Sequence, residues 1–209
     1  MRFRPISPAA LVGELTSRIA ERRKGDRLRV VIDGAPVAGT GALADVLVAP
    51  LRAAGRPVLR VAIQDFLRPA SVRLERGRTD PEAFYRDWLD TGALRREVLD
   101  PLAPGGSGQV LPALWDAATD RAYRLAKVEL ATGGILLADG ALSLGRDLPW
   151  DLTVHLALSE AALARLLPGE SHWQLPAYRR YLTEVDPLGQ ADVVVRMDHP
   201  AHPAVMHPA

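Results

Sequence analysis

The chain has 209 residues, of which 48% are hydrophobic and 24% charged, a composition typical of a soluble globular domain with a sizeable core. Its formal net charge of +1 argues against a nucleic-acid or membrane partner, and its 0 cysteines exclude disulfides, thiolate catalysis and cysteine-based zinc sites. No apolar run approaches the roughly 20 residues of a membrane span, and residues 1–5 lack the apolar core of a signal peptide. We therefore interpret the protein as cytoplasmic.

Apolar periodicity predicts alternating helices and strands along most of the chain. The first helix is expected to begin at Pro8 with Ser7 as its N-cap, and a buried strand follows at 28–32. A glycine loop then leads into a helix that ends at about Arg52. Further strands are expected at 58–63, 109–114, 135–140, 151–158 and 191–195, and further helices after residue 81 and at 159–167 and 178–185. Residues 121–130 fit a strand or a helix.

This order of elements predicts an α/β fold of three layers with a mainly parallel sheet. No internal repeat or domain-sized break is visible, so we expect a single domain over residues 1–209 with a core at about 28–195. Residues 196–209 are rich in proline and carry His199, His202 and His207. We interpret them as a flexible tail rather than as a metal site.

The glycine loop follows the order of a P-loop, whose pattern is G-x-x-x-x-G-K-[ST]. Gly34 and Gly39 occupy the two glycine positions, between the strand at 28–32 and the next helix. The following two positions do not match, because Thr40 stands where lysine belongs and Gly41 where Ser or Thr belongs. The loop is therefore a degenerate form of the motif.

This loop keeps the backbone part of a phosphate site but lacks the side-chain part. Backbone N–H groups at a helix N-terminus bind anions without side-chain help, and that half survives. The lysine that reaches the phosphates and the hydroxyl that holds Mg²⁺ are absent. Removing one preorganised transition-state donor typically lowers a rate by about 10²–10³. A plain strand, turn and helix with glycines for tight packing is the alternative interpretation.

Residues that follow strand carboxyl ends are the next candidates, because such residues line the ligand crevice of doubly wound sheets. Asp65 and Arg68 follow the strand at 58–63, and Asp139 ends the strand at 135–140, where an acid in P-loop proteins holds Mg²⁺. A helix cap or a surface turn is the alternative for both acids. Tyr85 and Trp115 could stack on a base, although most aromatic side chains pack in cores.

Several segments resemble one family in their order and spacing. They are Val31–Gly34, Asp65–Pro69, Pro81–Asp87, Asp90 with Ala93–Arg96, Asp100–Gly106, Leu137–Gly140, Trp150–Leu152, Arg180–Val185 and Ala191–Val195. On these segments the chain resembles the uridine kinase family of P-loop nucleoside kinases, from about Leu28 to Val195. The resemblance implies a P-loop NTPase-like fold and ATP-dependent phosphorylation of a ribonucleoside 5′-hydroxyl, with ATP and Mg²⁺ as cofactors if kinase activity persists.

The resemblance also implies roles for individual residues. The carboxylate that acts on the attacking hydroxyl in that family falls at Gln64, which cannot accept a proton, while Asp65 lies one residue later. Asp90 falls where the family binds the ribose hydroxyls, and Asp139 keeps the place of the metal-binding acid. The family's lid carries several arginines, but the stretch after Arg165 has no further arginine until residue 179.

The departures from the family pattern, at Thr40, Gly41, Gln64 and the lid, all affect groups that act in phosphoryl transfer. We therefore expect a cleft that binds a nucleoside, nucleotide or similar small molecule, with ordinary ATP-dependent transfer lost or repurposed, either as a pseudoenzyme or with a new reaction. Two alternatives stay open: an active uridine or cytidine kinase with an unusual loop, and a structural or interaction domain. The sequence also leaves open a homo-oligomer.

Overall fold

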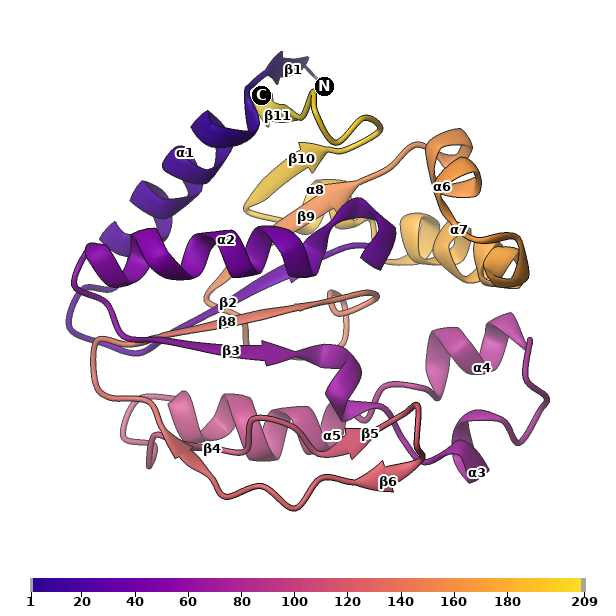
Figure 1. Cartoon of the computed structure of the whole chain (residues 1–209), viewed down its shortest axis with the longest axis horizontal. Coiled ribbons are helices and arrows are strands. Elements are labelled where there is room, and N and C mark those ends of the chain that lie inside the picture. The colour runs from indigo at the N-terminus through magenta and orange to yellow at the C-terminus, as the bar shows by residue number, and fades with distance from the viewer. Residues whose placement is uncertain (1, 208–209) are drawn as a thin grey trace.

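The computed structural model describes residues 2–207, and its centre is a seven-stranded sheet flanked by helices (Figure 1). The strands are β1 (Arg2–Pro5), β2 (Leu28–Asp33), β3 (Val58–Ala62), β8 (Ile135–Gly140), β9 (Leu152–Ala157), β10 (Val193–Arg196) and β11 (Ala204–His207). Their order in the sheet is β1-β11-β10-β9-β2-β8-β3, and the five strands from β10 to β3 are parallel. The predicted α/β class with a mainly parallel sheet is confirmed.

Helices cover both faces of this sheet. The α-helices are α1 (Pro8–Glu21), α2 (Thr40–Ala53), α3 (Ala70–Arg73), α4 (Pro81–Arg86), α5 (Thr91–Leu94), α6 (Glu160–Leu166), α7 (Leu175–Glu184) and α8 (Pro187–Gln190). Short 3-10 helices are η1 (Pro36–Ala38), η2 (Ile63–Phe66), η4 (Asp100–Leu102) and η5 (Gly169–Gln174), and η3 (Arg95–Leu99) is π-helical. None of the helices within residues 2–207 is long and apolar enough to span a bilayer.

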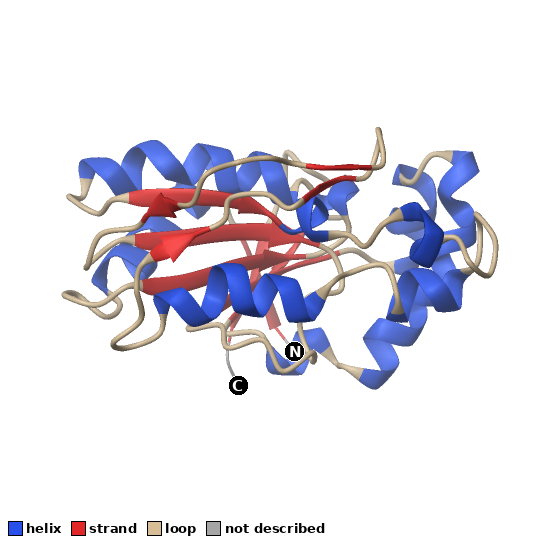
Figure 2. Ribbon diagram, turned by 90° about the horizontal axis from the view of Figure 1, so that it is seen from below, coloured by secondary structure: helices blue, strands red, loops and turns tan. Residues whose placement is uncertain are grey.

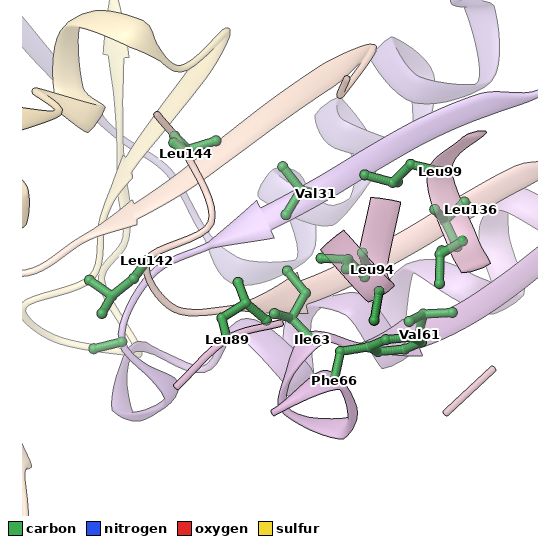
Figure 3. Close-up of a cluster of buried hydrophobic side chains, with 14 of the residues drawn as sticks. Val31, Val61, Ile63, Phe66, Leu89, Leu94, Leu99, Leu136, Leu142 and Leu144 are labelled. Carbon is green, nitrogen blue, oxygen red and sulfur yellow. The ribbon is translucent and has the colours of Figure 1, made fainter. Parts of the chain in front are cut away.

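Two hydrophobic clusters, one on each face of the sheet, account for the three layers (Figure 2). Val30 and Ile32 of β2 pack in the cluster that contains Leu15 of α1 and Leu47 of α2. Val31 packs on the opposite side. There its cluster contains Phe66, Leu94, Leu99 and Leu136, among others (Figure 3). Because both faces of β2 are buried, its sequence is a continuous apolar run rather than an alternating one.

Side-chain caps set several helix starts where the sequence predicts them. Ser7 accepts a hydrogen bond from the backbone N–H of Ala10, and Pro8 is the first helical residue of α1. Asp80 caps α4 in the same way, by accepting from the N–H of Ala83. These caps use local sequence alone, which is why the pattern predicts them.

The ends of the chain depart from the prediction. The segment 196–209 was expected to be a flexible tail, but within the described residues it contains β11, which pairs with both β10 and β1. The sequence pattern also missed β1, because a four-residue edge strand has no periodicity of its own. Residues 208 and 209, the last two of the predicted tail, lie outside the described residues.

Residues 109–130 form less regular structure than predicted. The expected strand at 109–114 is reduced to β4 (Gln109–Val110), which pairs with β7 (Val128–Glu129). Between them β5 (Trp115–Asp116) pairs with β6 (Arg121–Ala122) in a second small ribbon. Such short pairings depend on tertiary contacts, so a sequence window does not reveal them.

Candidate functional site

The glycine loop keeps the backbone of a phosphate-binding loop. Gly34 has a φ of 148°, and a Cβ at this position would lie 2.8 Å from the carbonyl oxygen of Leu156. Gly39 adopts the left-handed conformation, with φ 86° and ψ 29°, directly before α2. The first N–H groups of α2 have no intrahelical acceptor, so they are free to bind an anion.

The side chains of the loop supply no cation. Thr40 is only 2% exposed, packed at the start of α2. Gly41 lies against Asp139, and a Cβ at residue 41 would be 3.2 Å from Asp139 Oδ2. A serine at this position would therefore require Asp139 to shift by a few tenths of an ångström.

Asp139, at the carboxyl end of β8, is paired with an arginine from the neighbouring strand. Arg60 of β3 donates from Nη1 to Asp139 Oδ1 at 2.8 Å and to the carbonyl oxygen of Leu137 at 3.0 Å. Its Nε donates to Asp45 Oδ1 of α2 at 3.0 Å. Asp139 is 9% exposed, so much of its charge is offset by a guanidinium in a partly buried pair.

These residues do not fit a Mg²⁺ ion held as P-loop kinases hold it. Such an ion needs the loop hydroxyl and the strand-end acid. Here Gly41 has no hydroxyl, and one oxygen of Asp139 is already bonded to Arg60. Among residues 2–207, no group of three or more His, Asp or Glu side chains is arranged to hold a metal ion.

A cavity of about 440 Å³ opens beside the glycine loop, at the edge where β2, β3 and β8 end. Its wall combines the start of α2 with residues that follow β3 and β8 and with residues of α4 and α7. In Figure 1, α4 and α7 lie beyond the ends of these strands. The cavity is lined by Pro36, Gly39, Thr40, Gly41, Ala42, Ile63, Gln64, Leu67, Phe84, Trp88, Leu89, Asp139, Gly140, Ala141, Leu142, Arg146, Gln174 and Tyr178.

Aromatic side chains form the wall opposite the loop. Phe84 packs edge to face against Trp88, with ring centroids 5.1 Å apart, and against Tyr178 at 5.8 Å. Trp173 of η5 packs on the same cluster, 5.6 Å from both Phe84 and Trp88. The segment that was predicted to be a shortened lid without charge is thus attached to α4 by aromatic contacts.

Comparison with solved structures places this arrangement in a known fold. A possible uridine kinase from Bacillus stearothermophilus matches with a TM-score of 0.72 and 22% identity, over 89% of this chain and 97% of that chain. A candidate fructose transport system kinase from Silicibacter sp. TM1040 matches with a TM-score of 0.61 and 22% identity, over 89% and 95%. The YGR205w protein matches with a TM-score of 0.53 and 12% identity, over 85% and 76%.

The chain has a uridine kinase-like P-loop fold. At these identities the likeness shows the fold and not the reaction. No protein-family model matches the sequence, and the comparison with curated proteins gave no significant match.

Within this uridine kinase-like fold, some of the predicted site residues meet at the cavity. Gly39, Thr40, Gly41, Gln64 and Asp139 all line it. Gln64 lies on η2, directly after β3, with an exposed side chain. The loop, the strand-end acid and the position after β3 therefore come together as the sequence predicts.

Asp65 lies apart from this group. It does not line the cavity. Burial raises the pKa of the Asp65 carboxyl, and the charges of Asp116 and Asp139 add to the effect. It therefore shares a negative region with Asp116 of the β5–β6 ribbon, rather than facing the cavity directly.

Each of the remaining predicted substrate-binding residues makes a hydrogen bond within the protein. Asp90 caps α5 by accepting from the N–H of Ala93 at 2.8 Å. Trp115 donates from Nε1 to Asp120 at 3.0 Å. The backbone N–H of Arg68 donates to the carbonyl oxygen of Trp88, and the hydroxyl of Tyr85 donates to Glu184. The side chain of Arg165 donates to the carbonyl oxygen of Asp198. None of the five lines the cavity.

The sequence did not point to several residues that shape this site. Arg60 sits inside a predicted strand, and the register of β3 beside β8 brings it to Asp139. Trp88 follows α4 and Tyr178 lies on α7, far apart in sequence, so their contact with the cavity depends on the packing of α4 against α7. The aromatic content of both segments was the only signal available.

Proposed function

We propose that the cavity binds a nucleoside or a similar small molecule, and that ordinary ATP-dependent phosphoryl transfer has been lost or repurposed. One observation carries the proposal: the start of α2 and a group of aromatic rings both line the cavity, while the loop has no lysine and Asp139 is paired with Arg60. A uridine kinase-like fold is consistent with a small-molecule ligand at this edge of the sheet.

The chemistry of the wall favours a planar, partly polar ligand. Phe84, Trp88 and Tyr178 offer apolar and aromatic surface, against which a base could pack. Gln64 and Gln174 carry amide groups that can donate to and accept from hydroxyls or ring nitrogens. Few polar groups in a mainly apolar pocket are typical of small-molecule sites.

The same wall disfavours a triphosphate. A triphosphate carries several negative charges, and Arg146 is the single arginine or lysine among the lining residues. Lysine is absent from the loop, and Asp139 pairs with Arg60. Each missing preorganised donor typically lowers the rate by about 10²–10³, and the losses are not additive.

A phosphoryl-transfer assay tests the proposal. The purified protein is incubated with uridine or cytidine and ATP, with and without Mg²⁺, and the nucleoside monophosphate is quantified. We expect no product above a blank without protein. Efficient Mg²⁺-dependent formation of uridine monophosphate or cytidine monophosphate would show that the kinase alternative is correct.

Restoring the two missing motif residues tests whether the loop backbone still has the shape of a phosphate-binding loop. The double change Thr40→Lys with Gly41→Ser should raise ATP affinity, because the left-handed Gly39 and the start of α2 already have the form that the motif needs. The gain should be limited, since the new serine Cβ meets Asp139 at 3.2 Å. No gain at all would mean that the loop does not present its N–H groups to a phosphate.

A further inference from the structure

Arg146 differs from the other arginines around the cavity because it lacks a carboxylate partner. Arg86 pairs with Glu82, and Arg180 pairs with both Glu82 and Glu184. Within residues 2–207, Arg146 makes no such ion pair, although it lies on the cavity wall. Of these three arginines, Arg146 is therefore the one with no carboxylate at ion-pair distance within residues 2–207.

The guanidinium of Arg146 is held in place by neutral groups. Its Nε donates to the carbonyl oxygen of Leu142, and its Nη2 donates to the carbonyl oxygen of Tyr85. Its Cζ lies 5.6 Å from the centre of the Tyr85 ring. Two hydrogen bonds and a ring fix the side chain, yet none of them offsets its charge.

The nearest buried acid is already occupied. Both oxygens of Asp33 are bonded: Oδ1 accepts from Ser143, while Oδ2 accepts from Tyr181 and lies 2.7 Å from His155 Nδ1. Asp33 therefore acts on Arg146 only at longer range.

Burial makes an uncompensated cation unfavourable. It lowers the pKa of Arg146, which reflects the free energy needed to keep the charge away from water. Buried charges in folded proteins are paired or bind a partner of opposite sign. A cation fixed in a cavity wall and left without an acid is a feature of a site that receives an anion.

We propose that Arg146 binds an anionic group of the cavity's ligand, either a phosphate monoester or a carboxylate. Arg146 also lines an adjacent hollow of about 260 Å³, together with Tyr85, Arg86 and Tyr181, so the anion would sit where the two spaces meet. The planar guanidinium suits the bidentate recognition of such oxyanions. This inference rests on the proposed small-molecule function of the cavity and names one feature of its ligand.

Titration with uridine and with two of its anionic derivatives tests the inference. Wild-type protein, Arg146→Gln and Arg179→Gln are titrated calorimetrically with uridine, uridine 5′-monophosphate and uridine 5′-carboxylate. We expect the wild type to prefer one of the two anions over uridine by about 10- to 100-fold, as for a hydrogen bond to a charged group. The preferred anion identifies the source of the charge.

The variants distinguish the contribution of Arg146 from that of other arginines nearby. Arg146→Gln should remove the preference for the anion while uridine affinity stays similar. Arg179→Gln is the matched control, because Arg179 pairs with Glu160 and lines neither space, and it should keep the preference. If Arg146→Gln melts below the assay temperature, Arg146→Met takes its place, since apolar replacement of a buried ionic group is often tolerated.

Two results would overturn the inference: equal wild-type affinity for all three probes, or a preference that survives in the Arg146 variants. If no nucleoside binds, the proposed nucleoside function fails, and inorganic phosphate then tests Arg146 by itself. Phosphate should raise the melting temperature of the wild type but not of Arg146→Gln. No rise in the wild type would overturn the anion site as well.

Discussion

At the scale of single residues, the buried acid beneath the glycine loop ties several elements together. Asp33, at the end of β2, accepts from both the N–H and the hydroxyl of Ser143, at 2.9 and 2.8 Å. The Tyr181 hydroxyl of α7 donates to Asp33 at 2.9 Å and accepts from the N–H of Leu144 at 3.1 Å. Burial raises the pKa of Tyr181, so the phenol stays protonated as a donor. The network connects the loop, the segment after β8 and α7.

Removing the Tyr181 hydroxyl should therefore destabilise the fold. Tyr181→Phe leaves the Leu144 N–H and one position on Asp33 without a partner in a buried site, which costs about 1–3 kcal/mol. Urea unfolding gives the free energy of unfolding. Tyr123→Phe is the control, because Tyr123 is 38% exposed, and its effect should stay within about 0.5 kcal/mol. Equal effects of the two changes would contradict this account of the network.

Asp65 gives a prediction about pH. Its folded-state pKa is raised above the ordinary value of 3.8, mainly by burial, so its contribution to stability falls as pH rises through the raised pKa. Asp65→Asn cannot ionise, so it should gain melting temperature relative to the wild type as pH rises from about 4 to 7.

The neighbouring Asp116 serves as the control for Asp65. A hydrogen bond from the Thr119 hydroxyl lowers the pKa of Asp116, so its charged form contributes stability above the ordinary pKa and loses it as pH falls. Asp116→Asn should therefore give no gain at pH 7. A gain for Asp65→Asn that is the same at pH 4 and pH 7 would show that the pKa of Asp65 is not raised.

How much of the site the sequence predicts depends on how far apart in the sequence the interacting residues are. Gly34 and Gly39 follow from a motif whose spacing is local, and both have positive φ values. Asp139 was predicted from its place at a strand end, and it lines the cavity with Gly39. Asp90 was predicted from the family resemblance, yet its carboxylate is used as a helix cap. Arg60 could not be predicted, because its contact with Asp139 depends on strand register.

At the scale of elements, aromatic contacts connect η5 with α4 and with Trp88. The η5 segment forms a 3-10 helix whose Trp173 packs against Phe84 of α4 and against Trp88. An ion pair of Arg180 with Glu82 joins α7 to α4 beside it, and Arg180 also pairs with Glu184 within α7. The aromatic cluster thus holds η5 and α7 against α4.

Trp173→Ala should release η5 from α4. Two aromatic pairs are lost, each about 0.5–1.5 kcal/mol beyond the area that they bury. Amide protons of 169–174 should then exchange about tenfold faster or more, measured by hydrogen–deuterium exchange. Trp115→Ala, in the separate β5–β6 ribbon, should leave this exchange unchanged. Unchanged exchange in Trp173→Ala would mean that the cluster does not hold η5.

At the scale of the whole molecule, the two ends of the chain complete one side of the sheet. β11 pairs antiparallel with β10 and with β1, and Ile6 donates from its N–H to the carbonyl of Pro203. The five parallel strands follow from their apolar runs, which local sequence shows. The edge strand β1 depends on pairing with β11, about 200 residues away, which local sequence does not show.

Deleting residues 197–209 should lower the melting temperature by several degrees, because the edge of β10 and the pairing of β1 are both lost. In a domain of this size each 1 kcal/mol shifts the melting temperature by about 2–4 °C. Differential scanning calorimetry measures the shift. Deleting only residues 208 and 209 is the control. A melting temperature unaffected by the longer deletion would mean that β11 adds nothing to stability.

Calorimetric titration of the wild-type protein with uridine and, separately, with ATP in the presence and absence of Mg²⁺ tests the central claim most directly. The claim is that the aromatic wall binds a nucleoside while the loop and Asp139 no longer bind Mg²⁺·ATP. We predict measurable binding of uridine and no strengthening of ATP binding by Mg²⁺. Tight ATP binding that depends on Mg²⁺, with no binding of uridine, would contradict the claim.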